Sequence, residues 1–109
     1  MISWHDFEKI DIRCGTVIDV KDFPNARKPS YQLTVDFGEI GVKRSSAQIT
    51  HYYAKQQLLN KQVIAVLNFP VKQIANFFSE CLVLGVYDEN NEVVLLQPER
   101  KVANGTKIG

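Results

Sequence analysis

The sequence predicts an all-β domain with short helices, arranged as a five-stranded closed barrel in a single domain of 109 residues. Three observations predict this fold. Apolar and polar residues alternate with the period of two that half-buried strands show. A glycine lies in the middle of the first long strand, where a barrel strand has to bend. The one helical segment falls between the third and fourth strands. A small β-sandwich is the competing architecture.

The first half of the chain supplies three strands. From residue 10 to residue 20 the even positions are mostly apolar and the odd positions mostly polar or small, and Gly15 predicts a bulge or a sharp bend. Two prolines fix a loop over residues 23–29. The elements that follow are a half-buried strand at 31–37, a tight connection at 38–41 and a third strand at 42–48.

The second half begins with a short helix within residues 49–60, where Thr50 is a suitable N-cap and the apolar residues have helical spacing. Residues 63–69 and 81–87 are apolar on both faces, as strands in a crowded interior are. A hairpin loop at 88–92, a last strand at 93–96 and a turn at Asn104-Gly105 complete the chain. The position of the helix favours the OB-fold barrel over the sandwich.

Positive charge is concentrated in one segment of a nearly neutral chain. The formal net charge is only +1, yet residues 40–79 contain no Asp or Glu and carry Lys43, Arg44, Lys55, Lys61 and Lys72. Five aromatic residues lie in the same segment. Cations beside aromatic faces are the usual means of binding single-stranded or looped RNA. Lys55 and Lys61 bracket the expected helix, and solvation of that helix is the simpler explanation for both.

No catalytic site, metal site or cofactor is predicted, so we expect a binding protein and not an enzyme. His5 and His51 have no Cys or His at metal-ligand spacing. Ser45 and Ser46 lack the glycine-flanked turn that exposes a nucleophile. A Gly-rich phosphate loop is also missing.

The sequence is that expected of a cytoplasmic protein without membrane insertion. Acidic residues near the N-terminus do not fit an export signal, and no apolar run approaches the roughly 20 residues that span a bilayer. Cys14 and Cys81 lie within apolar patterns. We expect both to be free thiols in the core, as is usual in a reducing compartment.

Several stretches resemble the tRNA-binding domain family. They are residues 7–17 (FEKIDIRCGTV), 68–80 (NFPVKQIANFFSE) and 93–98 (VVLLQP), with shorter matches at 23–27, 35–38 and 104–109. Together they cover essentially the whole chain. The resemblance implies an OB-fold, a homodimer and recognition of the folded shape of tRNA. Within the family, the chain is most similar to the free-standing CsaA proteins, which are described as secretion-related chaperones.

The resemblance also implies which residues bind RNA. Asn68, Lys72 and Ser79 match the family's RNA-facing loop, while Lys43, Arg44 and Ser45 fall on the third strand, where family members also contact ligand. Lys43 and Arg44 are adjacent on a strand and therefore point to opposite faces. At most one of them can lie on a given ligand face.

Two departures from the tRNA-binding pattern favour the CsaA branch. Asn76 replaces a frequent glycine, which is tolerable because Asn accepts left-handed backbone angles. Glu80 follows Ser79 where many tRNA binders have a Gly-Met pair, and it adds a negative charge beside the expected phosphate contact.

Two functions stay open. A chaperone would bind unfolded or pre-secretory polypeptides through Phe77, Phe78 and Glu80, and of the two adjacent phenylalanines one is expected in the core and the other on the surface. A structure-specific tRNA binder is the alternative. A homodimer interface is expected at Ile2, Trp4 and Phe7, because these apolar residues near the chain end have few obvious partners within the chain.

Overall fold

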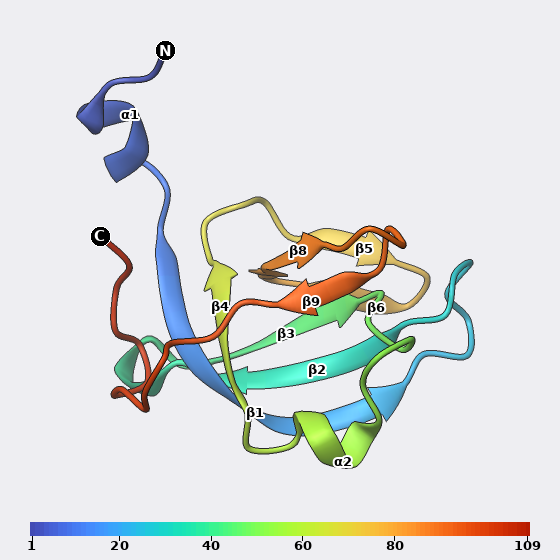
Figure 1. Ribbon diagram of the computed structural model, residues 1–109. Coiled ribbons are helices and arrows are strands. Elements are labelled where there is room, and N and C mark those ends of the chain that lie inside the picture. The colour runs from blue at the N-terminus through green and yellow to red at the C-terminus, as the bar shows by residue number, and fades with distance from the viewer.

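A curved antiparallel sheet of five strands forms the body of the computed structural model, which describes residues 1–109 (Figure 1). Its strand order is β3-β2-β1-β4-β7, and it forms a nearly closed barrel that confirms the predicted OB-fold-like architecture. The strands are β1 (Ile12–Asp22), β2 (Tyr31–Asp36), β3 (Val42–Ala47), β4 (Gln62–Val66) and β7 (Leu82–Val83).

Two short hairpins and three short helices complete the fold. One hairpin pairs β5 (Lys72–Ile74) with β6 (Phe77–Ser79), and the other pairs β8 (Gly85–Tyr87) with β9 (Val93–Leu95). The helices are α1 (Trp4–Glu8), the 3-10 helix η1 (Gly38–Ile40) and α2 (Lys55–Leu58). The predicted helix is therefore present but only four residues long, and its N-cap is Ala54, not Thr50. The hairpin β5-β6 lies where the sequence predicted only a loop.

The long strand β1 pairs with β2 along one half and with β4 along the other. Its register against β2 shifts between Val17 and Asp19. The sequence predicted an irregularity at Gly15, so the observed one lies further along the strand. Gly15 has a different role. A Cβ atom there would lie 2.6 Å from the Phe37 ring, so only glycine lets that ring pack against the strand. Cys14 and Val17, three positions apart and therefore on opposite faces of β1, are both buried, so both faces of the strand are covered here.

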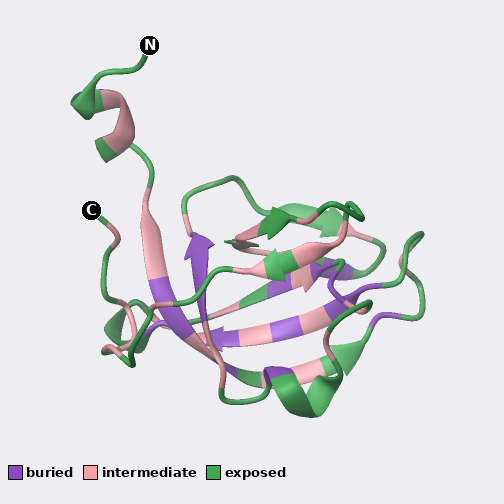
Figure 2. Cartoon of the chain, in the orientation of Figure 1, coloured by how far each residue is buried: buried purple, intermediate pink, exposed green.

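The core lies inside the barrel, as the buried segments along the strands show (Figure 2). Burial alternates along β2, as predicted, and Leu33 and Val35 are fully buried. The buried residues of β4 are consecutive, as predicted, but the strand ends at Val66 and Phe69 is exposed, so the predicted interior strand over 63–69 is too long. Cys14 and Cys81 are free and buried, which confirms the expectation for both, and burial raises the pKa of each thiol, that of Cys81 to about 11.

The prediction of one interior strand over residues 81–87 is wrong. The segment divides into β7 and β8, and the side chains of Leu82, Val86 and Tyr87 are exposed. Only β7 joins the barrel sheet, whereas β8 turns away to pair with β9. None of the helices is both long enough and apolar enough to span a membrane.

Candidate binding groove

Residues 79–81 close the barrel against the outer edge of β3, and we call this junction the seam. The Glu80 N–H donates to the Arg44 carbonyl (2.8 Å), and the Arg44 N–H donates to Glu80 Oε1 (3.0 Å). Two residues further along β3, the Ser46 N–H donates to Ser79 Oγ (3.2 Å). Glu80 and Ser79 therefore pair with β3 partly through their side chains, in place of a regular ladder.

Beyond the seam the surface opens into a cavity of about 570 Å³, which we call the binding groove. Its floor includes residues 46–49 at the end of β3, and its walls come from the β5-β6 hairpin, β7 and the β8-β9 hairpin. The charged residues of the lining are Lys28, Lys72 and Glu92. Most of the remaining lining is apolar and includes Ile74, Leu82, Val83, Tyr87 and Val93.

The residues predicted to bind RNA are not gathered at this groove. Lys72 and Ser79 line it, but Asn68 does not. The Asn68 side chain instead holds the N-terminal segment: its Oδ1 accepts from the Asp11 N–H (2.9 Å) and its Nδ2 donates to the Lys9 carbonyl (2.7 Å).

Ser45 lies in the core and not at the groove. It is only 1% exposed, and its hydroxyl donates to the Cys81 carbonyl at 2.8 Å. The alternation of β3 places Ser45 on the same face as the buried Ala47, toward the core. Its burial leaves Ser45 almost no surface for a direct contact with RNA.

Lys43 and Arg44 point to opposite faces of β3, as predicted. Lys43 shares the inner face with Ser45 and is half-buried, whereas Arg44 is exposed on the outer face. The Arg44 guanidinium lies 4.3 Å from the centroid of the Phe77 ring, a cation–π distance. Neither side chain lines the groove.

The two adjacent phenylalanines separate as expected. Phe77 is 1% exposed and its ring centroid lies 5.3 Å from that of Phe23, so it is the core member of the pair and leaves almost no surface for a peptide. Phe78, on the opposite face of β6, is 52% exposed. The left-handed residue of this hairpin is Ala75 (φ 54°), not Asn76 as the sequence comparison suggested.

A second cavity, of about 270 Å³, adjoins the groove and shares Lys72, Ser79, Cys81 and Leu82 with it. Phe69 and Pro70 form its apolar wall, and Glu80 lies in its lining. The sequence did not predict Phe69 or Leu82 as site residues. Both lie in segments that are mostly apolar, and the hydropathy pattern of such a segment does not show which side chains are exposed.

Three tyrosines hold the β8-β9 hairpin in place as a wall of the groove. The Leu95 N–H donates to the Tyr53 hydroxyl (3.0 Å), and the Tyr31 hydroxyl donates to the Tyr53 carbonyl (2.8 Å). The Tyr52 hydroxyl donates to the Asp88 carboxylate. This bond lowers the pKa of Asp88 and raises the pKa of Tyr52, because it favours the charged carboxylate and the neutral phenol.

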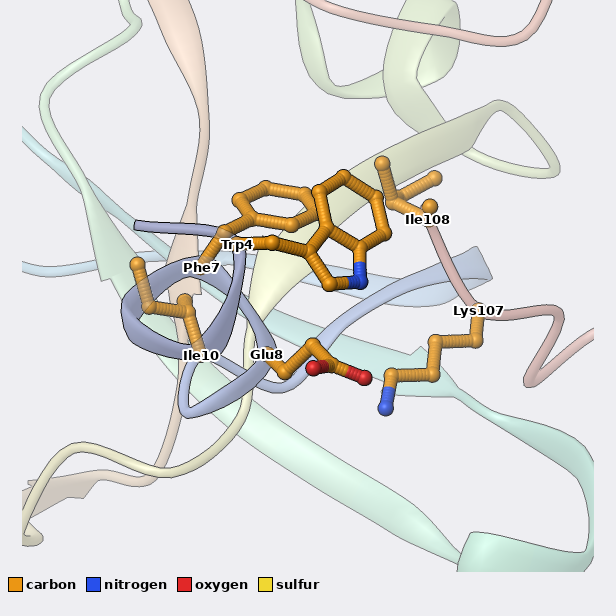
Figure 3. A pocket seen from close by; sticks show the side chains of 7 residues that line it. Trp4, Phe7, Glu8, Ile10, Lys107 and Ile108 are labelled. Carbon is orange, nitrogen blue, oxygen red and sulfur yellow. The ribbon is translucent and has the colours of Figure 1, made fainter. Parts of the chain in front are cut away.

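Of the residues predicted to form a dimer interface, Trp4 and Phe7 lie on α1 and Ile2 precedes it; α1 projects from the barrel near the C-terminus (Figure 1). No residue of α1 is buried, and Trp4 is 67% exposed. The Trp4 and Phe7 rings pack against each other, with centroids 5.3 Å apart, beside a cavity of about 250 Å³ that Ile10 and Ile108 also line (Figure 3). Ile2 is likewise exposed.

Comparison with known proteins gives consistent results. The family model described as putative tRNA binding domain matches residues 12–107. The crystal structure of the chaperone CsaA from Bacillus anthracis has a TM-score of 0.94 and 50% identity, covering 100% of this chain and 99% of that chain. The CsaA chaperone from Picrophilus torridus has a TM-score of 0.93 and 54% identity, with 100% of both chains covered.

A methionine–tRNA ligase from Pyrococcus horikoshii is 38% identical over 107 residues, which are 98% of this chain. The chain spans only 14% of the length of that ligase. A similar ligase from Nanoarchaeum equitans is 36% identical over 108 residues, again 14% of its length.

Proposed function

The chain belongs to the putative tRNA-binding domain family, and we propose that it is a non-catalytic protein of the CsaA type that binds unfolded or pre-secretory polypeptides in the groove. The lining of the groove is the observation that carries this proposal. Its apolar residues come from several elements, and its charges are two lysines and one glutamate. A polyanion needs several cations together, whereas an extended polypeptide needs apolar contact area and backbone partners.

The dispersal of the predicted RNA-binding residues supports the same choice. Arg44 lies over the Phe77 ring, Ser45 is buried and Asn68 is bonded to the N-terminal segment. Lys72 and Ser79 alone of the six line the groove. Only Lys72 of these two carries a positive charge, so they supply little of the phosphate neutralisation on which tRNA affinity depends.

Glu80 favours a polypeptide ligand less directly than the sequence suggested. Its carboxylate is not free beside the groove, because Oε1 accepts the Arg44 N–H. It still places a negative charge next to Lys72 in the smaller cavity. A basic residue of a polypeptide would be accepted there more readily than a phosphate.

Structure-specific tRNA binding is the second candidate function. It is supported by the family itself and by the methionine–tRNA ligases among the relatives. Lys28 and Lys72, which line the same groove, would be the phosphate contacts. Affinity arising from those contacts should fall steeply as the salt concentration rises.

We also propose that the protein is a cytoplasmic homodimer with α1 at the interface. Ile2, Trp4 and Phe7 offer an apolar surface that the chain itself leaves uncovered. A two-fold pair would bring two grooves into one particle and raise its avidity for a long client. Trp4→Ala should shift the sedimentation coefficient toward the monomer at micromolar concentration, and a wild-type protein that sediments as a monomer would contradict the proposal.

The decisive experiment compares an unfolded, carboxymethylated protein with bulk tRNA as ligands at low and high salt. Leu82→Asp places a charge in the apolar lining, and Lys28→Glu/Lys72→Glu reverses the charge of the lysines. Lys21→Glu/Lys101→Glu is the matched control, because it makes the same charge change at exposed positions outside the groove.

We expect the wild-type protein to bind the unfolded ligand with little dependence on salt concentration. We expect the Leu82→Asp variant to lose this binding. Binding of the unfolded protein that Leu82→Asp leaves unchanged would contradict the groove as the site. Salt-dependent tRNA binding that Lys28→Glu/Lys72→Glu abolishes, without any binding of the unfolded protein, would establish the second candidate instead.

A further inference from the structure

The binding groove contains a stretch of backbone that the chain itself does not pair. Gln48, Ile49 and Thr50 follow directly after β3, and their N–H and C=O groups make no backbone hydrogen bond. Ile49 is anchored by its buried side chain, and Gln48 is exposed. Gln48 and Ile49 both line the groove. The segment is therefore held in place while its polar backbone groups stay unpartnered.

The geometry of β3 shows in which direction these groups point. Residues 44 and 46 direct their N–H groups away from β2, because both donate to residues of the seam. Backbone groups alternate between the two edges of a strand with a period of two. The Gln48 N–H therefore falls on the same outer edge, one step beyond the last position that the seam covers.

The seam itself imitates a neighbouring strand along the first half of this edge. Glu80 both donates to and accepts from Arg44, as a paired strand residue would, and Ser79 accepts the Ser46 N–H. The pairing of the seam with β3 ends there, and from residue 46 onward the edge of β3 borders the groove. A second chain lying in the groove would continue the pairing that the seam begins.

We infer that an extended polypeptide segment binds by adding a strand to the outer edge of β3 at residues 46–50, between that edge and the β8-β9 hairpin. This inference rests on the proposed function and specifies its ligand. Recognition by strand addition takes its affinity from the main chain and its selectivity from pockets for alternate side chains. The client is therefore an extended, β-prone segment, and a helical segment of equal hydrophobicity is not one.

The lining of the groove determines which side chains suit the bound strand. Leu82, Val83 and Val93 offer apolar contacts to one face of it. The charged residues of the same lining are two lysines, Lys28 and Lys72, and one glutamate, Glu92. Alternating apolar residues with polar residues of either charge between them fit this arrangement. An RNA strand has no repeating backbone N–H groups to pair with the edge of a strand, and it would meet only two lysines.

The experiment uses a fluorescent peptide of about ten residues, long enough for a strand of average length, with Val, Leu or Phe alternating with Ser or Lys. Two N-methylated versions are compared, one carrying methyl groups on the odd residues and the other on the even residues. In a strand the N–H groups of these two sets point to opposite edges. We expect one version to lose binding by tenfold or more and the other to bind as the parent does.

A pair of protein variants tests the same edge from the other side. Gln48→Pro removes the N–H that we assign to the bound strand, whereas Gln48→Ala keeps it and changes only the side chain. Proline is compatible with an edge position of this kind. We expect Gln48→Pro to reduce the affinity for the parent peptide roughly two- to tenfold, the usual contribution of one hydrogen bond. Gln48→Ala should leave this affinity unchanged. Circular dichroism confirms that both variants are folded.

Each outcome separates the inference from the function on which it rests. If the peptide binds but both methylated versions bind as tightly, strand addition is wrong while polypeptide binding stands. This arm does not depend on the folding of any variant. If no peptide binds but bulk tRNA does, the inference and the proposed polypeptide function are both overturned.

Discussion

Replacing Glu80 should destabilise the barrel through a hydrogen bond and not through its charge. In the seam, Glu80 Oε1 accepts the Arg44 N–H at 3.0 Å, while the Glu80 N–H donates to the Arg44 carbonyl. A substitution removes only the first of these bonds, since the second belongs to the backbone. Glu80→Ala therefore leaves one donor of β3 without its acceptor.

The expected loss follows from the surroundings of that bond. A hydrogen bond to a charged acceptor contributes about 1.5–3 kcal/mol, and a neutral one about 1 kcal/mol. Arg44 is exposed, so water partly replaces the lost acceptor and the lower value applies. We expect Glu80→Ala to reduce the free energy of unfolding by about 1 kcal/mol, which is about 4 °C in Tm for a chain of this length.

Equilibrium unfolding in urea, with Glu80→Gln and Glu89→Ala beside Glu80→Ala, measures this effect. Gln keeps an oxygen acceptor, so Glu80→Gln should cost less than half as much. Glu89 is exposed in the β8-β9 loop, so Glu89→Ala should stay within about 0.5 kcal/mol of wild type. Equal losses for Glu80→Gln and Glu80→Ala would refute the reasoning. A tenfold rise in tRNA affinity of Glu80→Gln would show that the carboxylate acts on ligand as well.

Three further predictions concern the β5-β6 hairpin and the core. Phe77→Ala should cost about 3–5 kcal/mol in urea unfolding, because its ring is buried, whereas Phe78→Ala should cost less than about 0.5 kcal/mol. Ala75→Gly should raise Tm by a few degrees, since a left-handed backbone (φ 54°) costs a residue with a side chain about 1–2 kcal/mol, more than the added flexibility of glycine. Burial raises the pKa of the Cys81 thiol from 9.0 to about 11. Its stabilising contribution should therefore be complete below pH 9 and be lost as the pH rises toward 11, at up to about 1.4 kcal/mol per pH unit, and Cys81→Ala should remove that part of the pH profile.

The strands that bury one face were predictable from the sequence. Residues 31–37 alternate because every second side chain enters the core, and β2 shows that alternation directly. Residues 81–87 could not be assigned in the same way. Leu82 and Tyr87 are as apolar as core residues, yet they line the binding groove, and hydropathy does not distinguish a surface that faces a ligand from an interior.

The binding groove was predictable only in part. Lys72 and Ser79 were selected and do line it, because their loop is one continuous segment. Lys28 and Val93 come from distant segments that only the closed barrel brings together, so no local pattern marks them. The role of Glu80 was missed for another reason: its charge is visible in the sequence, but its bonds to Arg44 depend on how the barrel closes.

Incomplete closure of the barrel is what makes the groove possible. A complete ladder along β3 would satisfy every backbone group and leave no edge for another chain. Here the seam pairs only residues 44 and 46, so the edge beyond them is open where it borders the groove. An exposed strand edge invites association between copies of a protein, and charged side chains beside the edge discourage it. Lys28 and Lys72 lie at this groove in both copies of any such pair, so their mutual repulsion opposes edge-to-edge association. The polypeptide client that we propose, if its charge is nearly balanced, would not meet that repulsion.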